Sequence, residues 1–215
     1  MTQEQKKYIE NNIKLLEDGE WDKFFKDAPT GIGEVLYEAG INFMSELGYV
    51  HSNAFSGSDV QIVVIPDGVT SMEDYAFANC KSLTSVVMSD SVTSIGIYAF
   101  NYCDKLARIK ISDNIVSIGM GAFWGCTSLT NVVIPHNVTS IDYATFCNCI
   151  SLTSIEISNS VTSIGDKAFY SCGKLEIKYD GTTVEWKHLI GNNRRVFGYT
   201  AYTCKCIDGV VKKSS

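Results

Sequence analysis

The sequence predicts an α/β repeat solenoid, in which short parallel strands and tight turns stack in register and a cap covers each end. Three observations predict this fold: cysteine recurs every 23 residues, phenylalanine and leucine keep the same step, and no insertion interrupts the run. The cysteines of the series are Cys80, Cys103, Cys126, Cys149 and Cys172. Self-similarity at a fixed period in this range is typical of stacked repeat architectures.

Five consecutive copies of the 23-residue unit occupy residues 63–177. The phenylalanines in phase are Phe77, Phe100, Phe123, Phe146 and Phe169, and the leucines are Leu83, Leu106, Leu129, Leu152 and Leu175. One unit buries too little apolar surface to offset the entropy lost when it is ordered. We therefore expect the units to be stable only as the rungs of a stack.

Each copy contains the same series of local elements. Alternating apolar residues, such as Val132 and Ile134, predict a short strand with one buried face. A turn follows the strand and is marked, in the first copy, by Gly68. A second extended stretch then leads into a helical or 3₁₀ turn, which contains Ala99 and Phe100 in the second copy.

The repeat motif resembles that of a known family. In one copy it reads Val92-Thr93-Ser94-Ile95-Gly96-Ile97-Tyr98-Ala99-Phe100-Asn101-Tyr102-Cys103. This pattern resembles the repeats of BspA-like leucine-rich-repeat proteins. The resemblance implies a curved, right-handed leucine-rich-repeat stack with a parallel β-sheet on its concave side. The best-known members of that family are bacterial and protozoan surface proteins that bind host proteins.

Both ends of the chain depart from the repeat, which predicts that they are caps. Residues 1–48 predict a helical N-terminal cap. Residues 49–62 predict a degenerate first rung, because Val60 keeps the phase whereas Phe55 is one position out of it. Residues 178–215 predict a C-terminal cap. The segment Tyr179-Asp180-Gly181-Thr182, followed by Glu185-Trp186, resembles the YxGTxxEW closing element of BspA-like chains.

Composition and charge argue against several classes of function. The formal net charge is −6, and no stripe of lysine and arginine supplies the basic surface that nucleic-acid binding needs. No apolar run is long enough to span a membrane, and the amino-terminal residues lack the apolar region of a signal peptide. We therefore expect a cytoplasmic protein without nucleic-acid or membrane partners. The opposite charges of the two ends allow weak head-to-tail association as an alternative to the expected monomer.

The cysteines of the repeat are predicted to be buried structural thiols. Equivalent residues of stacked rungs have parallel Cα–Cβ bonds, which do not face each other as a disulfide requires. Cys147 with Cys149, and Cys204 with Cys206, have an alternate spacing, but no pair of histidines lies at ligand spacing. We therefore expect neither a metal nor another cofactor.

No catalytic site is predicted. His51, His136 and His188 lie at unrelated positions of the architecture, and the turn position of His136 indicates a solvated side chain. Nucleophilic catalysis needs a histidine beside an activated serine or cysteine, and the sequence shows no such pair.

The predicted partner-binding residues are aromatic residues of the turn segment that vary from copy to copy. They are Tyr75, Tyr98, Tyr102, Trp124, Tyr143 and Tyr170. Tyrosine and tryptophan dominate binding hot spots, but these rings can equally cover the edges of adjacent rungs. The strand positions Arg108, Lys110 and Glu156 are the next candidates.

The predicted function is a non-enzymatic scaffold that presents a rigid repeat surface to a partner protein of unknown identity. The resemblance to BspA-like proteins also implies an alternative, a surface adhesin or carbohydrate-binding module. Compact chains with a helical leader, a few repeats and this closing element resemble those of gut bacteria and their phages. A phage- or mobile-element-encoded, host-modulating protein is therefore a further alternative.

Deletion of residues 1–48 should make the protein aggregate, because the end of a solenoid is an unpaired sheet edge with exposed apolar side chains. Size-exclusion chromatography of the truncated protein, together with its melting temperature, measures this effect. A truncated protein that stays monomeric with an unchanged melting temperature would show that these residues form a separate domain.

Overall fold

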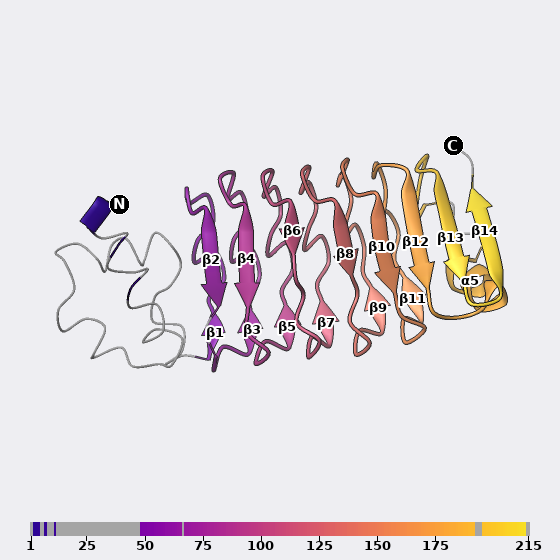
Figure 1. The fold of residues 1–215 in the computed structure, drawn as a ribbon, viewed down its shortest axis with the longest axis horizontal. Coiled ribbons are helices and arrows are strands. Elements are labelled where there is room, and N and C mark those ends of the chain that lie inside the picture. The colour runs from indigo at the N-terminus through magenta and orange to yellow at the C-terminus, as the bar shows by residue number, and fades with distance from the viewer. Residues whose placement is uncertain are drawn as a thin grey trace.

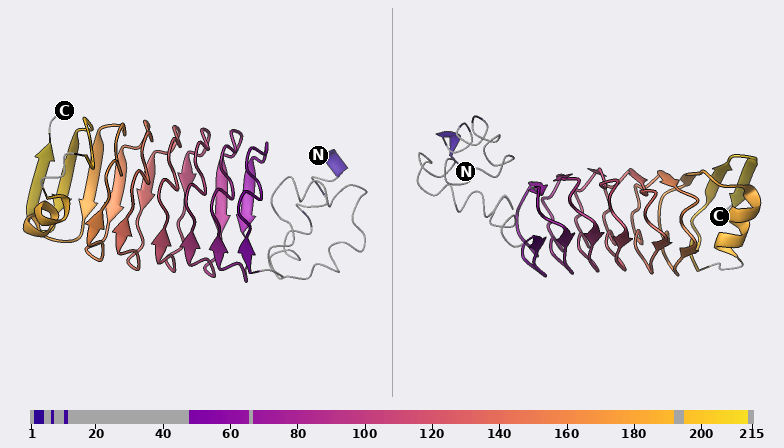
Figure 2. Two further views of the ribbon diagram at one scale, coloured as in Figure 1. Left: turned by 180° about the vertical axis from the view of Figure 1, so that it is seen from behind. Right: turned by 90° about the horizontal axis from the view of Figure 1, so that it is seen from below.

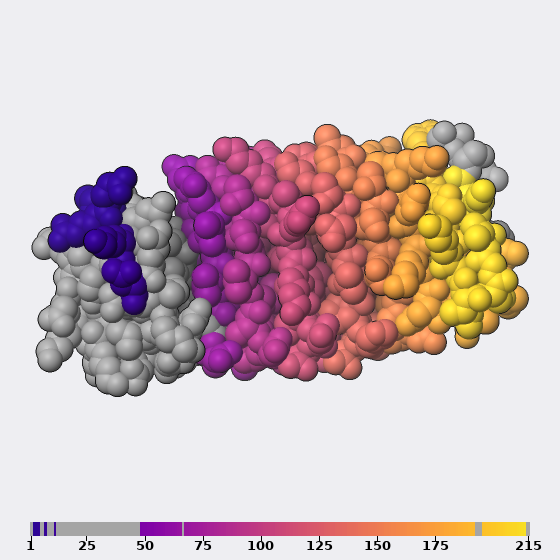
Figure 3. All heavy atoms as spheres, viewed as in Figure 1, coloured from indigo at the N-terminus to yellow at the C-terminus, as the bar shows by residue number. Residues whose placement is uncertain are grey.

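A computed structural model of the chain describes residues 2–4, 7, 11, 48–65, 67–191 and 195–213. From residue 48 onward these residues form a β-solenoid in which each repeat makes one turn, or rung (Figure 1). Successive rungs are in contact along the whole stack (Figure 3). The helices expected over residues 1–48 lie outside the described residues, apart from a few isolated positions, and remain a prediction.

One long sheet runs the length of the solenoid. Its eight strands lie in the order β14-β13-β12-β10-β8-β6-β4-β2 and are parallel except for the last hairpin, β13–β14. The strands are β2 (Ile62–Ile65), β4 (Ser85–Met88), β6 (Arg108–Ile109), β8 (Asn131–Val133), β10 (Ser154–Ile157), β12 (Leu175–Tyr179), β13 (Tyr202–Cys206) and β14 (Gly209–Lys213). In β8, β10 and β12, buried residues alternate with more exposed ones, as the sequence predicts for a sheet with one buried face.

A second set of two-residue strands follows the turn in each rung (Figure 2). Four of them form one parallel sheet, β1-β3-β5-β7, and β11 pairs with β9 in another. Their bounds are β1 (Tyr49–Val50), β3 (Ser71–Met72), β5 (Ser94–Ile95), β7 (Ser117–Ile118), β9 (Ser140–Ile141) and β11 (Ser163–Ile164).

The segment expected to be a helical or 3₁₀ turn is a series of tight turns. Its N–H groups alternate between two kinds of acceptor: Asn101 N–H donates to the Tyr98 carbonyl three residues back, at 3.1 Å, whereas Phe100 N–H donates to Ala122 of the next rung, at 2.8 Å. This alternation needs a left-handed backbone at two positions of the repeat, which in one rung are Tyr98 and Tyr102, both with φ of 54°. In the next rung these positions are glycines, Gly121 and Gly125, for which this conformation carries no steric penalty.

A stack of phenylalanine rings forms the centre of the core. Phe55, Phe77, Phe100, Phe123, Phe146, Phe169 and Phe197 follow one another with centroid separations between 5.1 and 5.7 Å. All seven rings are buried. Their offset-parallel contacts are a favourable aromatic geometry, and they extend the in-phase series by one ring at each end.

The in-phase cysteines form a ladder of hydrogen bonds beside this stack. Each thiol donates to the carbonyl of a phenylalanine in the preceding rung, as in Cys103 to Phe77, Cys126 to Phe100 and Cys149 to Phe123, all at 3.1 Å. Cys80 and Cys172 make the same bond to Phe55 and Phe146. We call Cys80, Cys103, Cys126, Cys149 and Cys172 the cysteine ladder, and all eight cysteines of the chain are free thiols.

The phase shift at Phe55 reflects a one-residue deletion in the first rung. The carbonyl of Ala78 accepts from Gly57, 21 residues earlier, whereas Asn79 donates to Asn101, 22 residues later. The full step is restored by Gln61, whose carbonyl accepts from Thr84. The deletion therefore lies between Gly57 and Gln61, and it leaves Phe55 in the aromatic stack.

The closing element forms a capped helix, α5 (Thr183–Ile190), at the C-terminal end. Thr182 and Glu185 make a reciprocal capping box, which explains the threonine and glutamate of the YxGTxxEW element. The tryptophan of the element, Trp186, is completely buried and packs on Tyr179 at 5.3 Å. Within the described part of the chain, no helix is long and apolar enough to cross a membrane.

Alkylation should label the native protein poorly and should give up to eight adducts once the chain is unfolded without reductant. The thiolate is the reactive form, and burial raises the pKa of Cys126 from 9.0 to about 12. Burial also raises the pKa of Cys149 well above its usual range. Intact-mass measurement counts the adducts, and disulfides between ladder cysteines would contradict the ladder.

Stability should also fall at alkaline pH. Because the pKa of Cys126 is higher in the folded state, its contribution to the free energy of unfolding is complete below about pH 9 and is lost as the pH rises towards 12. Urea unfolding on both sides of pH 9 measures this slope, and Cys126→Ala, which has no thiol there, should show a smaller one.

Candidate functional site

Four of the predicted binding residues surround one shallow hollow on the turn segment. Tyr75, Tyr98, Tyr102 and Trp124 line it together with Asn101, and its volume is about 300 Å³. We call these five residues the aromatic hollow. They come from three successive rungs, so that the stacking of rungs, rather than any local motif, assembles the site.

The left-handed turn positions direct two of these rings onto the following rung. An added Cβ on Gly121 would lie 2.2 Å from Cε1 of Tyr98, and one on Gly125 would lie 2.5 Å from Cδ1 of Tyr102. The rings of Tyr98 and Tyr102 therefore occupy space that only glycine leaves open. The packing of a large residue in one rung against a glycine in the next therefore determines where both rings lie.

The rings of the hollow are in contact with each other. Tyr75 stacks on Tyr98 with a centroid separation of 5.2 Å, and Tyr98 meets Trp124 at 6.0 Å. Burial, with a smaller contribution from Tyr75, raises the pKa of the Tyr98 hydroxyl. Lys81 lies over the ring of Tyr102 at 4.9 Å, a cation–π contact.

The hollow also contains specific polar groups. The side-chain amide of Asn101 donates to the carbonyl of Trp124 at 3.3 Å, which fixes the floor of the hollow. The indole Nε1 of Trp124 is buried and has no hydrogen-bond partner among the described residues. Planar apolar rings with a few donors and acceptors are the chemistry of a protein-recognition hot spot.

The two other predicted residues do not line the hollow. Tyr143 lies near Lys167, whose Nζ is 5.8 Å from the ring centroid, and Tyr170 packs over Gly198. The sequence analysis also missed Asn101. The signal was present, because Asn101, Trp124 and Tyr170 occupy the same position of the repeat in different copies.

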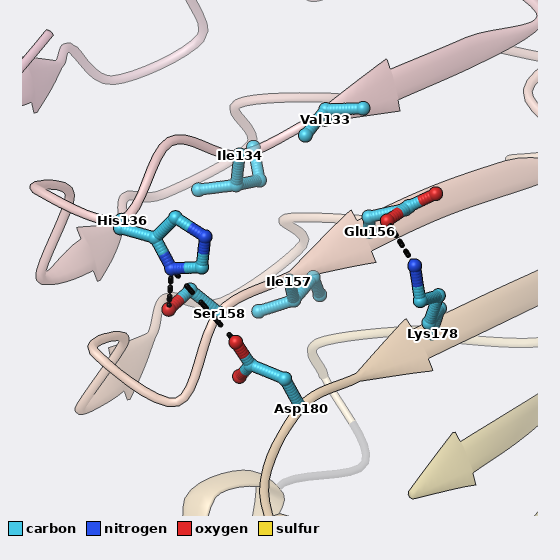
Figure 4. A pocket seen from close by; sticks show the side chains of 8 residues that line it. All are labelled: Val133, Ile134, His136, Glu156, Ile157, Ser158, Lys178 and Asp180. Carbon is cyan, nitrogen blue, oxygen red and sulfur yellow. Dashed lines mark hydrogen bonds and ion pairs between the residues drawn. The ribbon is translucent and has the colours of Figure 1, made fainter. Parts of the chain in front are cut away.

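A second, polar pocket of about 140 Å³ lies at the carboxyl ends of neighbouring strands (Figure 4). Its lining residues are Val133, Ile134, His136, Glu156, Ile157, Ser158, Lys178 and Asp180. The ring of His136 points toward Ser158 and Asp180, with Nδ1 at 2.8 Å from the Ser158 hydroxyl and 3.8 Å from the carboxylate of Asp180. Glu156 and Lys178 form an ion pair of 2.7 Å.

This serine, histidine and aspartate do not have the geometry of a catalytic triad. A triad needs the serine on one ring nitrogen and the carboxylate on the other, whereas Ser158 and Asp180 both face Nδ1 of His136. The side chain of His136 is 84% exposed, as its turn position predicts. The contact itself was not predicted, because 136, 158 and 180 are 22 residues apart and so escape a comparison at the repeat period.

The described residues contain no group of three or more histidine, cysteine, aspartate or glutamate residues that could hold a metal ion. The sulfurs of Cys204 and Cys206 lie 3.7 Å apart on one face of β13. Burial raises the pKa of both thiols, so that they are protonated at neutral pH.

The parallel rungs, the phenylalanine stack and the cysteine ladder define a leucine-rich-repeat solenoid. Residues 48–176 match the family model described as BspA type leucine rich repeat region, in six copies. The chain therefore belongs to the BspA-type leucine-rich-repeat family. No curated protein sequence matches it.

Solved structures of bacterial leucine-rich-repeat proteins are similar to this chain. A leucine rich cell surface protein from Faecalibacterium prausnitzii is 39% identical over 60% of this chain and 34% of its own length, with a TM-score of 0.57. The T. pallidum leucine rich repeat protein is 27% identical over 68% of this chain and 73% of its own, with a TM-score of 0.56. A Bacteroides ovatus leucine-rich repeat protein, 24% identical over 80% of this chain and 49% of its own, shares the fold with a TM-score of 0.55.

This chain thus spans about a third of the F. prausnitzii protein and about half of the B. ovatus protein. Proteins with this repeat and fold generally serve as protein-interaction or surface scaffolds and are typically not enzymes.

Gly121→Ala should destabilise the protein by about 1–3 kcal/mol, because the new methyl group meets the ring of Tyr98 and the backbone is left-handed. Chemical denaturation measures the free energy of unfolding. In a Tyr98→Ala background the same substitution should cost less, since only the backbone strain remains. Additive effects of the two substitutions would contradict the contact.

Proposed function

We propose that this protein is a non-enzymatic interaction scaffold that binds a partner protein through the aromatic hollow. The observation that carries the proposal is the assembly of four aromatic residues from three successive rungs around one exposed hollow. Tyr75 and Tyr102 are 40% and 41% exposed, so they offer a large contact area to a partner. Rigid aromatic anchors lose little conformational entropy on binding.

The surroundings of the hollow support this role. The rings of Tyr98 and Tyr102 pack over Gly121 and Gly125 of the following rung, which holds them in place before a partner arrives, and such preorganisation increases affinity. A partner that brings an apolar side chain to this place would pack against the exposed rings of Tyr75 and Tyr102.

A surface scaffold or adhesin is the second candidate. It is supported by the likeness to the F. prausnitzii protein, which is described as a leucine rich cell surface protein. Protease treatment and immunolabelling of intact and permeabilised source cells distinguish this location from the cytoplasmic one. The two candidates share the same use of the repeat surface and differ in the compartment of the partner.

Affinity purification from the source organism identifies the partner, and variants of the hollow then test the site. Trp124→Ala and Tyr98→Ala should each weaken binding by at least about 2 kcal/mol, as expected for hot-spot aromatic residues. Tyr143→Ala is the matched control, because its ring is also exposed but does not line the hollow. It should leave the affinity unchanged.

The melting temperature of each variant must be measured in parallel, since Tyr98 also packs on its neighbours. Retained binding with lost stability would identify these rings as packing residues. Equal losses of affinity in Tyr143→Ala and Trp124→Ala would also contradict a site centred on the hollow.

A further inference from the structure

The outward face of the long sheet is divided into two halves of different chemistry. The exposed positions form two rows across the strands. The registers define a first row that consists of Ile62, Ser85, Arg108, Asn131, Ser154 and Glu176. In the second row, Val64 lies beside Val87, and Val133 lies beside Glu156, which in turn lies beside Lys178. Lys110 follows Arg108 by two residues and occupies the repeat position between Val87 and Val133.

The C-terminal half of this face neutralises its own charges. Lys178 pairs with Glu156 at 2.7 Å, and Lys205 pairs with Glu176 at 3.5 Å. Both pairs join adjacent strands of the sheet. This half offers alternating charges that are already compensated, which is the usual character of a solvated sheet face.

The N-terminal half has two cations and no compensating carboxylate on the face. Arg108 and Lys110 are exposed and make no ion pair with any described residue. The nearest acidic residues along the chain leave them unpaired, because Asp104 pairs with Lys81 and Asp113 lies in the following turn. Arg108 lies in β6 and Lys110 directly follows this strand, so that two like charges two residues apart repel each other and favour an anionic ligand.

Arg108 lies between Ser85 and Asn131 in its row, whereas Lys110 occupies the repeat position between two valines, Val87 and Val133. Three residues on the outward side of the sheet are exposed although they are apolar: Ile62 (56%), Val87 (54%) and Val133 (54%). In the C-terminal half, the positions equivalent to Val87 and Val133 hold Glu156 and Lys178. The N-terminal half therefore combines exposed aliphatic residues with two positive charges that no carboxylate on the face compensates.

We propose that this half of the sheet, formed by the outward side chains of β2, β4, β6 and β8, binds an acidic, extended segment of a partner protein. The occupant follows from charge complementarity: Arg108 and Lys110 are about 6.7 Å apart along the strand, the separation of alternate residues in any extended segment. Two carboxylates at alternate positions of the segment match both cations, and aliphatic residues beside them bury Val87 and Val133. The proposal deepens the interaction role given above and adds a second surface to it.

Selection of random linear peptides displayed against the full-length protein tests this proposal. The expected peptides contain two acidic residues at alternate positions with at least one branched aliphatic residue nearby. Their affinity, measured by fluorescence anisotropy, should fall with rising salt concentration. For the double variant Arg108→Glu/Lys110→Glu, the affinity of the selected peptides should fall at least about tenfold. Peptides with lysine in place of the acidic residues should bind this variant instead.

Lys105→Glu/Lys174→Glu is the matched control. It changes the net charge equally, and both lysines are exposed at one repeat position just before the strands. It should keep the affinity of the wild type. Val87→Thr should weaken the peptides several-fold, since it keeps the shape of the side chain and removes apolar surface. All substituted residues are exposed, and circular dichroism verifies that each variant is folded.

The outcomes separate this proposal from the one on the aromatic hollow. Tyr98→Ala and Trp124→Ala should leave the acidic peptides bound, and a loss in these variants alone would assign the peptides to the hollow and overturn the sheet-face site. Absence of selected peptides, enrichment of peptides without acidic residues, or equal loss in the control variant would also overturn it. Single-stranded DNA that binds more tightly than the peptides through Arg108 and Lys110 would reassign the surface to a polyanion.

Discussion

Hydrogen bonding between successive rungs, through the backbone and through the thiol that each ladder cysteine donates to a phenylalanine carbonyl of the preceding rung, is the interaction on which the rest of the structure depends. Such a carbonyl lies in the core and already accepts the backbone N–H of the cysteine in its own rung, as Phe100 does from Cys103 at 3.2 Å, so that the thiol adds a second hydrogen bond. The thiol donor comes 26 residues after the acceptor in the chain, as Cys126 does for the carbonyl of Phe100. The backbone also depends on the next rung, because the N–H of Phe100 donates to the carbonyl of Ala122 at 2.8 Å. At the C-terminal end, the hydroxyl of Thr200 takes the place of the thiol and donates to the carbonyl of Phe169.

The same turn segment determines the shape of the outer surface. Because its N–H groups alternate between the rung itself and the next one, two positions of each repeat adopt a left-handed backbone, as at Tyr98 and Tyr102. Side chains at these positions lie against the following rung, where glycine leaves space for them. The aromatic hollow is thus a consequence of backbone satisfaction in the core combined with small residues in one neighbouring rung.

The 23-residue period can be read directly from the sequence. It was therefore possible to predict the repeat, its strands, its buried residues and its family. Two features could not be predicted from that period. The deletion between Gly57 and Gln61 shifts Phe55 in sequence but not in space, so only the hydrogen bonds locate it. The grouping of His136 and Ser158 follows a 22-residue offset between turns, which a comparison at the 23-residue period does not detect.

The division of roles within a rung explains how one chain can carry two different surfaces. The ladder cysteines, the phenylalanines and the leucines hold the rungs together. The residues at exposed positions can therefore vary without loss of stacking. Equivalent outward positions hold Val87, Lys110, Val133 and Glu156 in successive rungs without any change in the backbone register. Since rungs are about 4.8 Å apart, a change in one copy alters the chemistry of a narrow band and leaves its neighbours intact. The order of side chains along the stack therefore determines the chemistry of each surface, with aromatic residues on the turns and charged and aliphatic residues on the sheet.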